Sequence, residues 1–346
     1  MRDEAALGAV RALTPADFSS REVFELERRR LFAPAWIPVC RSDEVAEFGA
    51  QKATFAATTP VLVVRDEDGT LRAFSNVCRH RGLTLVEDRA VETAIRCPYH
   101  LWTYDLAGRL QASPFMDQER LGGCDLPTYA CGEWGGFVFV NPDGRAAPLA
   151  QQLAPLAEAI RPGRLAPWKV GFRLVFDHSW NWKVMVENFG ESYHHIGAHT
   201  ATLQPFWPGG RSDPSASTPG WIELRHTVDP QMGTFTVFVV FPLFLLAVSD
   251  PHGSAYWYRM VTLGPERIAL EIVGLFEPEL AADAAEMEAA RAQVLAIHLE
   301  DIPMCERVQA GLNSPDAALG PLSHLEAGVA RFRDWVAAGI AGPPSG

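Results

Sequence analysis

The sequence predicts an α+β protein with two unlike domains, a small all-β domain followed by a sheet with helices on one side. Short β-rich runs separated by turn signals fill residues 36–142. Longer strand-like runs alternate with helical patterns after a linker-like stretch at residues 143–148. A chain of 346 residues also exceeds the usual length of one domain, so about two domains are expected.

A helix is expected first, at residues 19–32, because Ser19 can cap it and the apolar residues that follow lie near one face. Residues 1–35 are therefore expected to form a helical segment that packs on the second domain. The all-β domain is assigned to residues 36–148. Its strands are expected at residues 61–65, 71–74, 94–97, 101–104 and 136–140.

The second domain, residues 149–346, is expected to begin with a helix at residues 149–160, and a further helical pattern starts near Asn181. A long acidic, Ala-rich helix is predicted from about residue 278 to residue 299. Pro303 should end it, because proline cannot donate the helical hydrogen bond, and another helical stretch follows through Leu312. The strands of this domain are expected at residues 170–176, 220–226, 233–248, 256–263 and 268–276.

Charge and composition exclude several classes of protein. The 42 acidic residues outnumber the 30 lysines and arginines, and a formal charge of −12 repels nucleic acid and anionic membranes. Residues 1–14 lack the apolar core of a signal peptide. The longest apolar run, residues 235–248, contains Pro242 and is too short for a membrane-spanning helix. We therefore expect a cytoplasmic enzyme with no nucleic acid or membrane partner.

Two Cys/His pairs form the first constellation of candidate metal ligands. Cys78-x-His80 is followed, after 16 residues, by Cys97-x-x-His100, and each pair ends a short hairpin loop. The pattern permits a structural zinc site or a two-iron, two-sulfur cluster held by two cysteines and two histidines. The cluster is favoured because each loop supplies one thiolate and one imidazole. The other four cysteines, Cys40, Cys124, Cys131 and Cys305, are expected to be small core residues.

The second constellation lies in the segment WNWKVMVENFGESYHHIGAHT, which contains His194 and His199. Five residues apart on a regular helix, the two side chains would point about 140° away from one another. The helix is therefore expected to end near Gly197, so that His199 returns from the following turn. Two imidazoles and one carboxylate form the facial triad of non-haem Fe(II) enzymes, which leaves positions open for O₂.

Around the first constellation the sequence resembles the cluster-binding loops of the Rieske family. Leu101 departs from the glycine that is common at its position. Because Leu101 is not a ligand, this departure puts little of the resemblance in doubt. The matching residues are Arg81 and Gly82 after His80, Pro98 and Tyr99 before His100, and Trp102, Tyr104, Asp105 and Gly108 beyond it.

The second segment resembles the iron-binding helix of Rieske oxygenases. The resemblance implies that His194 and His199 bind the mononuclear iron. It also makes Glu191 the carboxylate that bridges to a cluster histidine of the neighbouring subunit. His195 is read as a packing residue or one that supports the ligands. The residues that match the string are Asn181, Trp182, Lys183, Glu187, Asn188, Glu191, Tyr193, His194 and His199.

The third iron ligand must come from distant sequence. The segment HLEDIPMCERVQAGL resembles the C-terminal iron-ligand helix of the family and maps the ligand onto Asp301, with Glu300 as the fallback. Pro303 is expected to free the backbone so that a carboxylate turns inward. A solvated acidic pair that caps a helix is the alternative.

The resemblance covers nearly the whole chain and implies a Rieske domain followed by a catalytic domain of the helix-grip type, an antiparallel sheet covered by helices. It implies a [2Fe–2S] cluster, a mononuclear Fe(II) and a ring of three subunits, or a multiple of three. In that ring His100 passes electrons through Glu191 of the next chain. A ferredoxin or flavin reductase would deliver the electrons, because no G-x-G-x-x-G nucleotide fingerprint occurs. A Rieske electron carrier and a zinc-stabilised interaction protein are the alternatives.

The expected activity is mono- or dioxygenation, or oxidative demethylation, of a small organic substrate. The main prediction for the substrate is an aromatic compound, as in aromatic catabolism. A quaternary ammonium compound of the choline, betaine or carnitine kind is the alternative, because Glu191 stands where many ring hydroxylases have aspartate. Nine aromatic residues can line an apolar pocket or cage an ammonium group: Phe206, Trp207, Trp221, Phe235, Phe238, Phe241, Phe244, Trp257 and Tyr258.

Overall fold

The computed structural model describes residues 12–117, 121–227, 233–250 and 252–342. The chain divides into two compact units. Residues Phe32–Ala166 form one of them, which we call the β unit. Residues Met1–Leu31 and Pro167–Gly346 form the other, the α+β unit. None of the helices in the described part of the chain combines the length and the hydropathy that a transmembrane segment needs.

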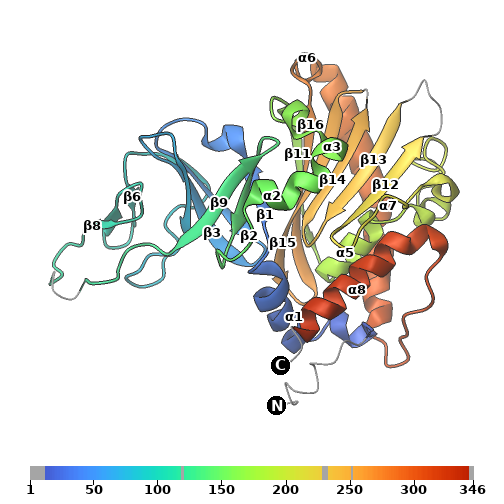
Figure 1. Ribbon diagram of the computed structural model, residues 1–346, viewed down its shortest axis with the longest axis horizontal. Helices are drawn as coiled ribbons and strands as arrows, with labels where there is room; N and C mark the ends of the chain where they lie inside the picture. Colours follow the sequence, from blue (N-terminus) through green and yellow to red (C-terminus); the bar gives the residue numbers. More distant parts are fainter. Residues whose placement is uncertain (1–11, 118–120, 228–232, 251, 343–346) are drawn as a thin grey trace. The chain divides into compact units, whose positions relative to one another are not determined.

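The β unit consists of two antiparallel sheets, seen in Figure 1 as the blue to green strands. A seven-stranded sheet has the order β1-β10-β9-β4-β3-β2-β5, and a small sheet has the order β6-β7-β8. The large sheet is formed by β1 (Ile37–Arg41), β2 (Ala50–Ala56), β3 (Thr59–Arg65), β4 (Leu71–Ser75), β5 (Arg89–Val91), β9 (Thr128–Trp134) and β10 (Phe137–Asn141). The small sheet is formed by β6 (Ile95–Arg96), β7 (Thr103–Tyr104) and β8 (Leu110–Ala112).

Three short helices follow β10 within the β unit: α2 (Leu149–Leu153), α3 (Ala157–Ile160) and α4 (Pro162–Leu165). The structural division therefore falls after residue 166, whereas the sequence suggested residue 148. Arg41, only 1% exposed, gives the physical reason, because its guanidinium donates to the carbonyl groups of Leu165 and Ala166, each at 3.3 Å. The helix expected over residues 149–160 is interrupted by a 3-10 turn that contains Pro155.

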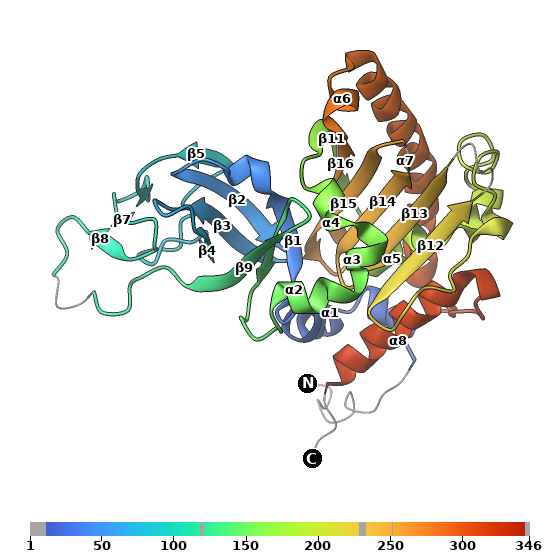
Figure 2. The same cartoon turned by 45° about the horizontal axis from the view of Figure 1, so that its top comes forward.

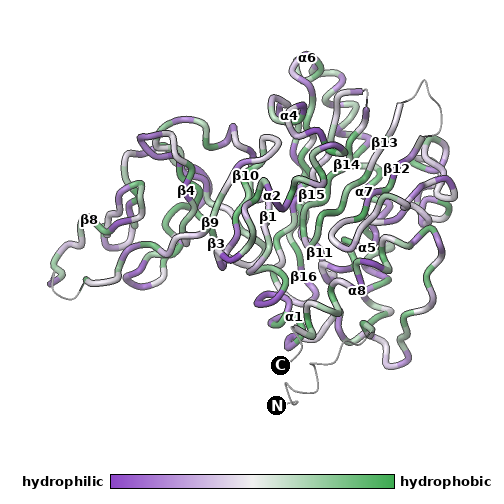
Figure 3. Tube along the Cα trace, viewed as in Figure 1, coloured by the Kyte–Doolittle hydropathy of each residue, from purple (hydrophilic) through white to green (hydrophobic). Residues whose placement is uncertain are grey.

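The α+β unit contains a six-stranded antiparallel sheet with the order β11-β16-β15-β14-β13-β12. The strand expected at residues 233–248 is two strands, β13 and β14, that pair with one another across a turn containing Pro242. The inner strands are predominantly hydrophobic, as Figure 3 shows for β14 to β16. The bounds are β11 (Lys169–His178), β12 (Trp221–Thr227), β13 (Thr234–Val240), β14 (Phe244–Asp250), β15 (Ser254–Gly264) and β16 (Arg267–Phe276).

Helices pack against this sheet, with α5 against β13, α7 against β11 and α8 against β12. Figure 2 shows the long helix α7 running beside the strands. The helices of the unit are α1 (Arg21–Glu27), α5 (Trp182–Phe189), α6 (Pro278–Ala281), α7 (Ala284–Leu312) and α8 (Ala327–Ala341). Together with the β unit, this arrangement confirms the expected fold class of an all-β domain and a helix-covered antiparallel sheet.

Helix α7 continues through Pro303, so the expected end of the helix before this proline is wrong. A proline inside a helix removes the hydrogen bond to the carbonyl four residues earlier, here that of Leu299. Leu299 is 53% exposed, so the turn of the helix that lacks this bond lies at the surface. The inward direction of Asp301 follows from helical periodicity instead, because His298, Asp301 and Cys305 share one buried face.

A buried ion pair attaches the N-terminal segment to the rest of the α+β unit. Lys183 on α5 donates to Glu27 on α1 at 2.5 Å, and both side chains are fully buried. The indole of Trp182 donates to the other oxygen of Glu27 at 2.8 Å. Asn181 caps α5 through a bond from the backbone N–H of Lys183. The N-W-K part of the second motif therefore anchors the helix rather than binding metal.

Substituting Lys183 with methionine should destabilise the protein by about 3–5 kcal/mol, because it leaves the buried Glu27 carboxylate without its counter-charge. Urea unfolding, compared with that of the unmodified protein, measures the change. The double variant Lys183→Met, Glu27→Leu should recover much of the lost stability. A single variant as stable as the unmodified protein would contradict the role of this ion pair.

A second buried pair is expected to make the stability depend on pH. His178 on β11 and His298 on α7 contact one another through their Nε2 atoms at 3.0 Å. Burial lowers the pKa of each from 6.5 to about 4. Both therefore stay neutral in the folded protein, whereas the unfolded chain takes up protons below pH 6.5.

Because these folded-state pKa values are depressed, the pair contributes fully to the free energy of unfolding above pH 6.5. This contribution should fall as the pH drops toward 4. The expected loss is on the order of a few kcal/mol at the acid end. Urea midpoints at pH 7.5 and pH 5 test this expectation. An unchanged midpoint would count against the neutral pair.

Candidate functional site: two metal-ligand clusters

Two loops of the β unit have the same backbone hydrogen bonds. The N–H of Cys78 donates to the carbonyl of Leu83, and that of Cys97 donates to the carbonyl of Trp102, both at 2.8 Å. In each loop the residue four positions after the cysteine donates back to the cysteine carbonyl at 3.1 Å. The two Cys/His pairs therefore lie on matching loops, as a site between two hairpin loops requires.

Across the two loops, the candidate ligands of each kind lie close together. The rings of His80 and His100 are 4.6 Å apart, and the Cys97 thiol lies within hydrogen-bonding reach of Cys78. The Nδ1 atom of His80 is buried and has no hydrogen-bond partner within the described residues. A buried imidazole nitrogen without a partner is suited to bind metal. Two thiols beside two imidazoles also match the ligand chemistry of a Rieske cluster.

Two aromatic residues support these ligands. Trp102 stacks on the His80 ring at 4.8 Å with planes 4° apart. The Tyr104 hydroxyl accepts from the backbone N–H of Arg79 at 3.2 Å and lies 3.6 Å from the Cys78 sulfur. Burial raises the pKa of Tyr104, so the phenol keeps its proton and can donate it to that sulfur. Hydrogen bonds to a ligand sulfur raise the reduction potential of a cluster.

The backbone of Leu101 is strained. It occupies the same loop position as Gly82, and both have left-handed φ angles, 59° for Leu101 and 76° for Gly82. A side chain is disfavoured in this conformation. The side chain is also 55% exposed, so it gains little from burial.

Substituting Leu101 with glycine should therefore stabilise the β unit by about 1 kcal/mol, because glycine adopts this conformation without strain. The melting temperature of the protein with its cluster measures the gain. Gly82→Ala supplies the opposite change at the matching position and should destabilise. A loss of stability in the Leu101→Gly variant would contradict the strain.

The second cluster lies in the α+β unit. Ligand atoms of His194, His199 and Asp301 lie within 4.8 Å of one another. Asp301 Oδ1 is 3.0 Å from His199 Nε2 and 3.7 Å from His194 Nε2. Neighbouring ligands on one face of a metal site with bonds near 2.1 Å lie about 3 Å apart. The two nitrogens and one oxygen therefore fit a facial triad.

Local structure sets these positions. Helix α5 ends at Phe189, and a 3-10 turn, η7 (Tyr193–Ile196), carries His194. Gly197 caps this turn, and His199 follows it with a bond from its N–H to the His195 carbonyl. This agrees with the expectation that His199 returns after Gly197.

Each histidine of the triad is held by a carboxylate. His194 Nδ1 lies 2.6 Å from Glu191, and His199 Nδ1 lies 2.7 Å from Glu300. Glu300 also accepts from the Thr202 hydroxyl at 2.5 Å. A carboxylate at Nδ1 fixes the tautomer and aims Nε2 at the metal. The geometry therefore places Asp301, not Glu300, among the triad atoms and gives Glu300 a supporting position.

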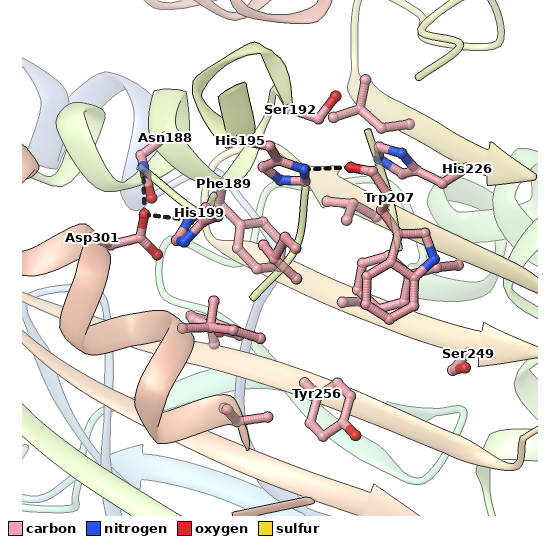
Figure 4. A pocket seen from close by; sticks show the side chains of 18 of the residues that line it. Asn188, Phe189, Ser192, His195, His199, Trp207, His226, Ser249, Tyr256 and Asp301 are labelled. Carbon is pink, nitrogen blue, oxygen red and sulfur yellow. Dashed lines mark hydrogen bonds and ion pairs between the residues drawn. The ribbon is translucent and has the colours of Figure 1, made fainter. Parts of the chain in front are cut away.

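His199 and Asp301 stabilise one another's charged forms. Burial lowers the pKa of His199, but hydrogen bonds and charge attraction from Asp301 and Glu300 outweigh it, and the net pKa is raised. Burial raises the pKa of Asp301, but the His199 hydrogen bond and the charges of both histidines outweigh it, and the net pKa is lowered. Asn188 donates to Asp301 Oδ1 at 3.1 Å and orients this carboxylate (Figure 4).

The triad opens into a cavity of about 290 Å³. Of the nine aromatic residues considered from the sequence, Trp207, Phe235 and Tyr258 line it, and Phe189 and Tyr256 join them. His195 also lines it, and its Nδ1 donates to the Trp207 carbonyl at 2.8 Å (Figure 4). His226 was not singled out from the sequence, since an isolated histidine in a strand carries no motif.

The Rieske [2Fe-2S] domain description matches residues 35–130, and that of the ring hydroxylating alpha subunit catalytic domain matches residues 165–342. The chain is 34% identical to a glycine betaine monooxygenase oxygenase subunit of Chromohalobacter salexigens, over 60% of this chain and 47% of the relative. It is 28% identical to a biphenyl dioxygenase subunit alpha of Metapseudomonas furukawaii, over 71% and 57%. The chain thus spans about half the length of these curated relatives.

A solved structure of a quaternary ammonium Rieske monooxygenase in complex with L-carnitine is 26% identical, with a TM-score of 0.81. The similarity covers 96% of this chain and 97% of that one. Of the two interpretations of the Cys/His pattern, the two-iron cluster is confirmed over structural zinc. The catalytic domain, which covers half of the chain, also rules out a Rieske domain alone. The chain belongs to the family of Rieske-type ring-hydroxylating oxygenase alpha subunits.

Proposed function

We propose that this chain is the terminal oxygenase component of a multicomponent Rieske oxygenase, which oxidises a small organic substrate with O₂ and electrons from NAD(P)H. The observation that carries the proposal is the triad of His194, His199 and Asp301 at the wall of a largely apolar cavity. Ligands of this kind that face a cavity leave metal positions open toward a substrate.

The proposed ligands of the cluster are Cys78, His80, Cys97 and His100, and those of the mononuclear iron are His194, His199 and Asp301. When bound, the cluster supplies single electrons and the mononuclear iron activates O₂. The chain's own residues then have separate tasks. Glu191 and Glu300 keep the two imidazoles oriented, and the apolar cavity wall limits the access of water to the reacting atoms.

We further propose an assembly of three chains, or a multiple of three, in which electrons pass from His100 of one chain through Glu191 of the next. Glu191 is suited to this role because it holds His194 twice, through the imidazole at 2.6 Å and the backbone N–H at 3.1 Å. A separate ferredoxin or flavin reductase would supply the electrons.

Mixed assemblies test the transfer between chains. Cys97→Ser chains lack a cluster ligand, and Asp301→Asn chains lack an iron ligand. Each alone should be inactive. Co-expressed with two different affinity tags and purified through both, they should regain activity, because an intact cluster then neighbours an intact iron site. Mixed assemblies without activity would exclude transfer between chains.

For the substrate, the relatives favour a quaternary ammonium compound over the aromatic compound that is the main prediction from the sequence. Named relatives act on glycine betaine and carnitine, whereas the biphenyl dioxygenase subunit is less similar. The five aromatic side chains along the cavity are compatible with either class, through cation–π contacts or ring packing.

Oxygen uptake with a surrogate ferredoxin and reductase tests the proposal. Choline, glycine betaine, carnitine and small aromatic compounds are the candidates, and product analysis separates demethylation from ring hydroxylation. Uptake that requires both the donor system and one of these compounds is expected. Protein that oxidises NADH without any partner would contradict it.

A further inference from the structure

The charges along the cavity limit which polar groups a substrate can carry. Among the described residues that line it there is no lysine or arginine. Its two carboxylates, Glu191 and Asp301, are both engaged with the triad histidines. His252, also in the lining, is exposed, so water screens any charge on it. Apart from a metal ion at the triad, a substrate carboxylate inside this cavity would therefore find no buried cationic side chain, which is costly.

The side chain of His226, on β12, forms a polar part of the cavity wall. It is 1% exposed, and its Nδ1 atom is buried and forms no hydrogen bond within the described part of the chain. The other buried, non-ligand histidine of the lining, His195, uses its Nδ1 to donate to the Trp207 carbonyl. A buried imidazole without a partner costs free energy unless some group binds it.

The position of His226 relative to the triad is fixed by a row of three imidazoles. The ring of His195 lies 5.5 Å from that of His199 and stacks on that of His226 at 5.9 Å, with planes 15° apart. Figure 4 shows His226 beside the Trp207 carbonyl, on the far side of His195 from Asp301. A group bound to His226 is therefore separated from the triad by the width of another ring.

Burial lowers the pKa of His226 to about 4, so the ring is neutral at physiological pH. A neutral imidazole has one donor and one acceptor nitrogen. It can bind a hydroxyl, carbonyl or amide group, but it offers a carboxylate no charge.

We propose that His226 is a specificity-determining residue that holds an uncharged hydroxyl, carbonyl or amide group of the substrate, and that the substrate carries no carboxylate. This inference rests on the proposed function, because it assumes that the cavity beside the triad is the substrate site. The oxidised carbon lies at the triad, so the anchored group is several bonds away from it. Glycine betaine and carnitine, which are carboxylates, are then poor substrates for this chain.

Two matched sets of ligands test this without turnover. One set is benzyl alcohol, ethylbenzene and benzoate. The other is choline, propyltrimethylammonium and glycine betaine. Binding is read from the change that each ligand causes in the EPR signal of the ferrous nitrosyl complex of the mononuclear iron in the holoprotein. Within at least one set, the alcohol should bind about tenfold more tightly than its apolar isostere, and more tightly than the carboxylate.

The His226→Phe variant should lose this tenfold preference while it binds the apolar isostere as before. His226→Gln, which keeps a donor and an acceptor, should retain part of it and serves if the phenylalanine variant does not fold. Tightest binding of the carboxylate in the unmodified protein, or an alcohol preference that survives His226→Phe, would overturn the inference. Absence of any nitrosyl signal in iron-loaded protein would instead overturn the proposed function.

Discussion

Replacing Asp301 with asparagine is expected to remove the mononuclear iron and to leave the visible spectrum of the cluster unchanged. Asp301 supplies the only oxygen of the triad, 3.0 Å from His199 Nε2, and a neutral amide binds Fe(II) far more weakly than a carboxylate. Turnover should fall by about a hundredfold or more, since changes even to residues that support the ligands cost 10–100-fold. Iron analysis should show one iron fewer per chain.

Glu306→Gln is the matched control for this substitution. Glu306 lies on the same helix but is exposed, so its variant should keep the iron and the activity. The iron content and activity of Glu300→Gln should fall between those of the other two variants, because this change removes only the support of His199. If the Asp301→Asn protein kept its full iron content, the assignment of the third ligand would be wrong.

Replacing Cys97 with serine is expected to abolish the cluster and with it the brown colour of the protein. Cys97 is 2% exposed and lies beside Cys78. Serine removes a thiolate ligand, and water cannot reach this buried position to replace it. The protein should still bind the mononuclear iron, but electrons from a reductase could no longer reach it. Turnover driven by NAD(P)H should therefore be undetectable.

Cys131→Ser provides the control. Its thiol donates to the Leu71 carbonyl at 3.3 Å, away from the ligand loops, and a serine hydroxyl can form the same bond. This variant should retain the cluster spectrum and the activity. Loss of the spectrum in Cys131→Ser, or its survival in Cys97→Ser, would contradict the ligand assignment.

The sequence predicted both constellations because their residues are close together in the chain. Cys78 with His80, and Cys97 with His100, lie on short loops whose spacing alone indicates a shared metal. The position of His199 after Gly197 followed from helical geometry in the same way. The two-domain class followed from the change in the length of the apolar runs. These predictions rest on local patterns, which a single sequence contains.

The remaining features depend on contacts between distant segments. Glu300 supports His199 across 101 positions of sequence, and no pattern around either residue indicates this. Helix α7 continues past Pro303, with the exposed Leu299 four residues before it, and exposure depends on packing. His226 reaches the cavity from a strand whose alternation predicts only an inward face. Trp257, Phe238 and Phe244 resemble pocket residues in the sequence but are core residues, at most 2% exposed.

A single-turnover experiment tests most directly whether the electron of the cluster is used at the second iron. The cluster is reduced chemically, excess reductant is removed, and O₂ is added together with a substrate. The return of the oxidised cluster absorbance is then followed in the unmodified and the Asp301→Asn proteins. Rapid, substrate-dependent reoxidation with formation of product is expected only in the unmodified protein. Equal rates of reoxidation in the two proteins would contradict the use of this electron at the iron held by His194, His199 and Asp301.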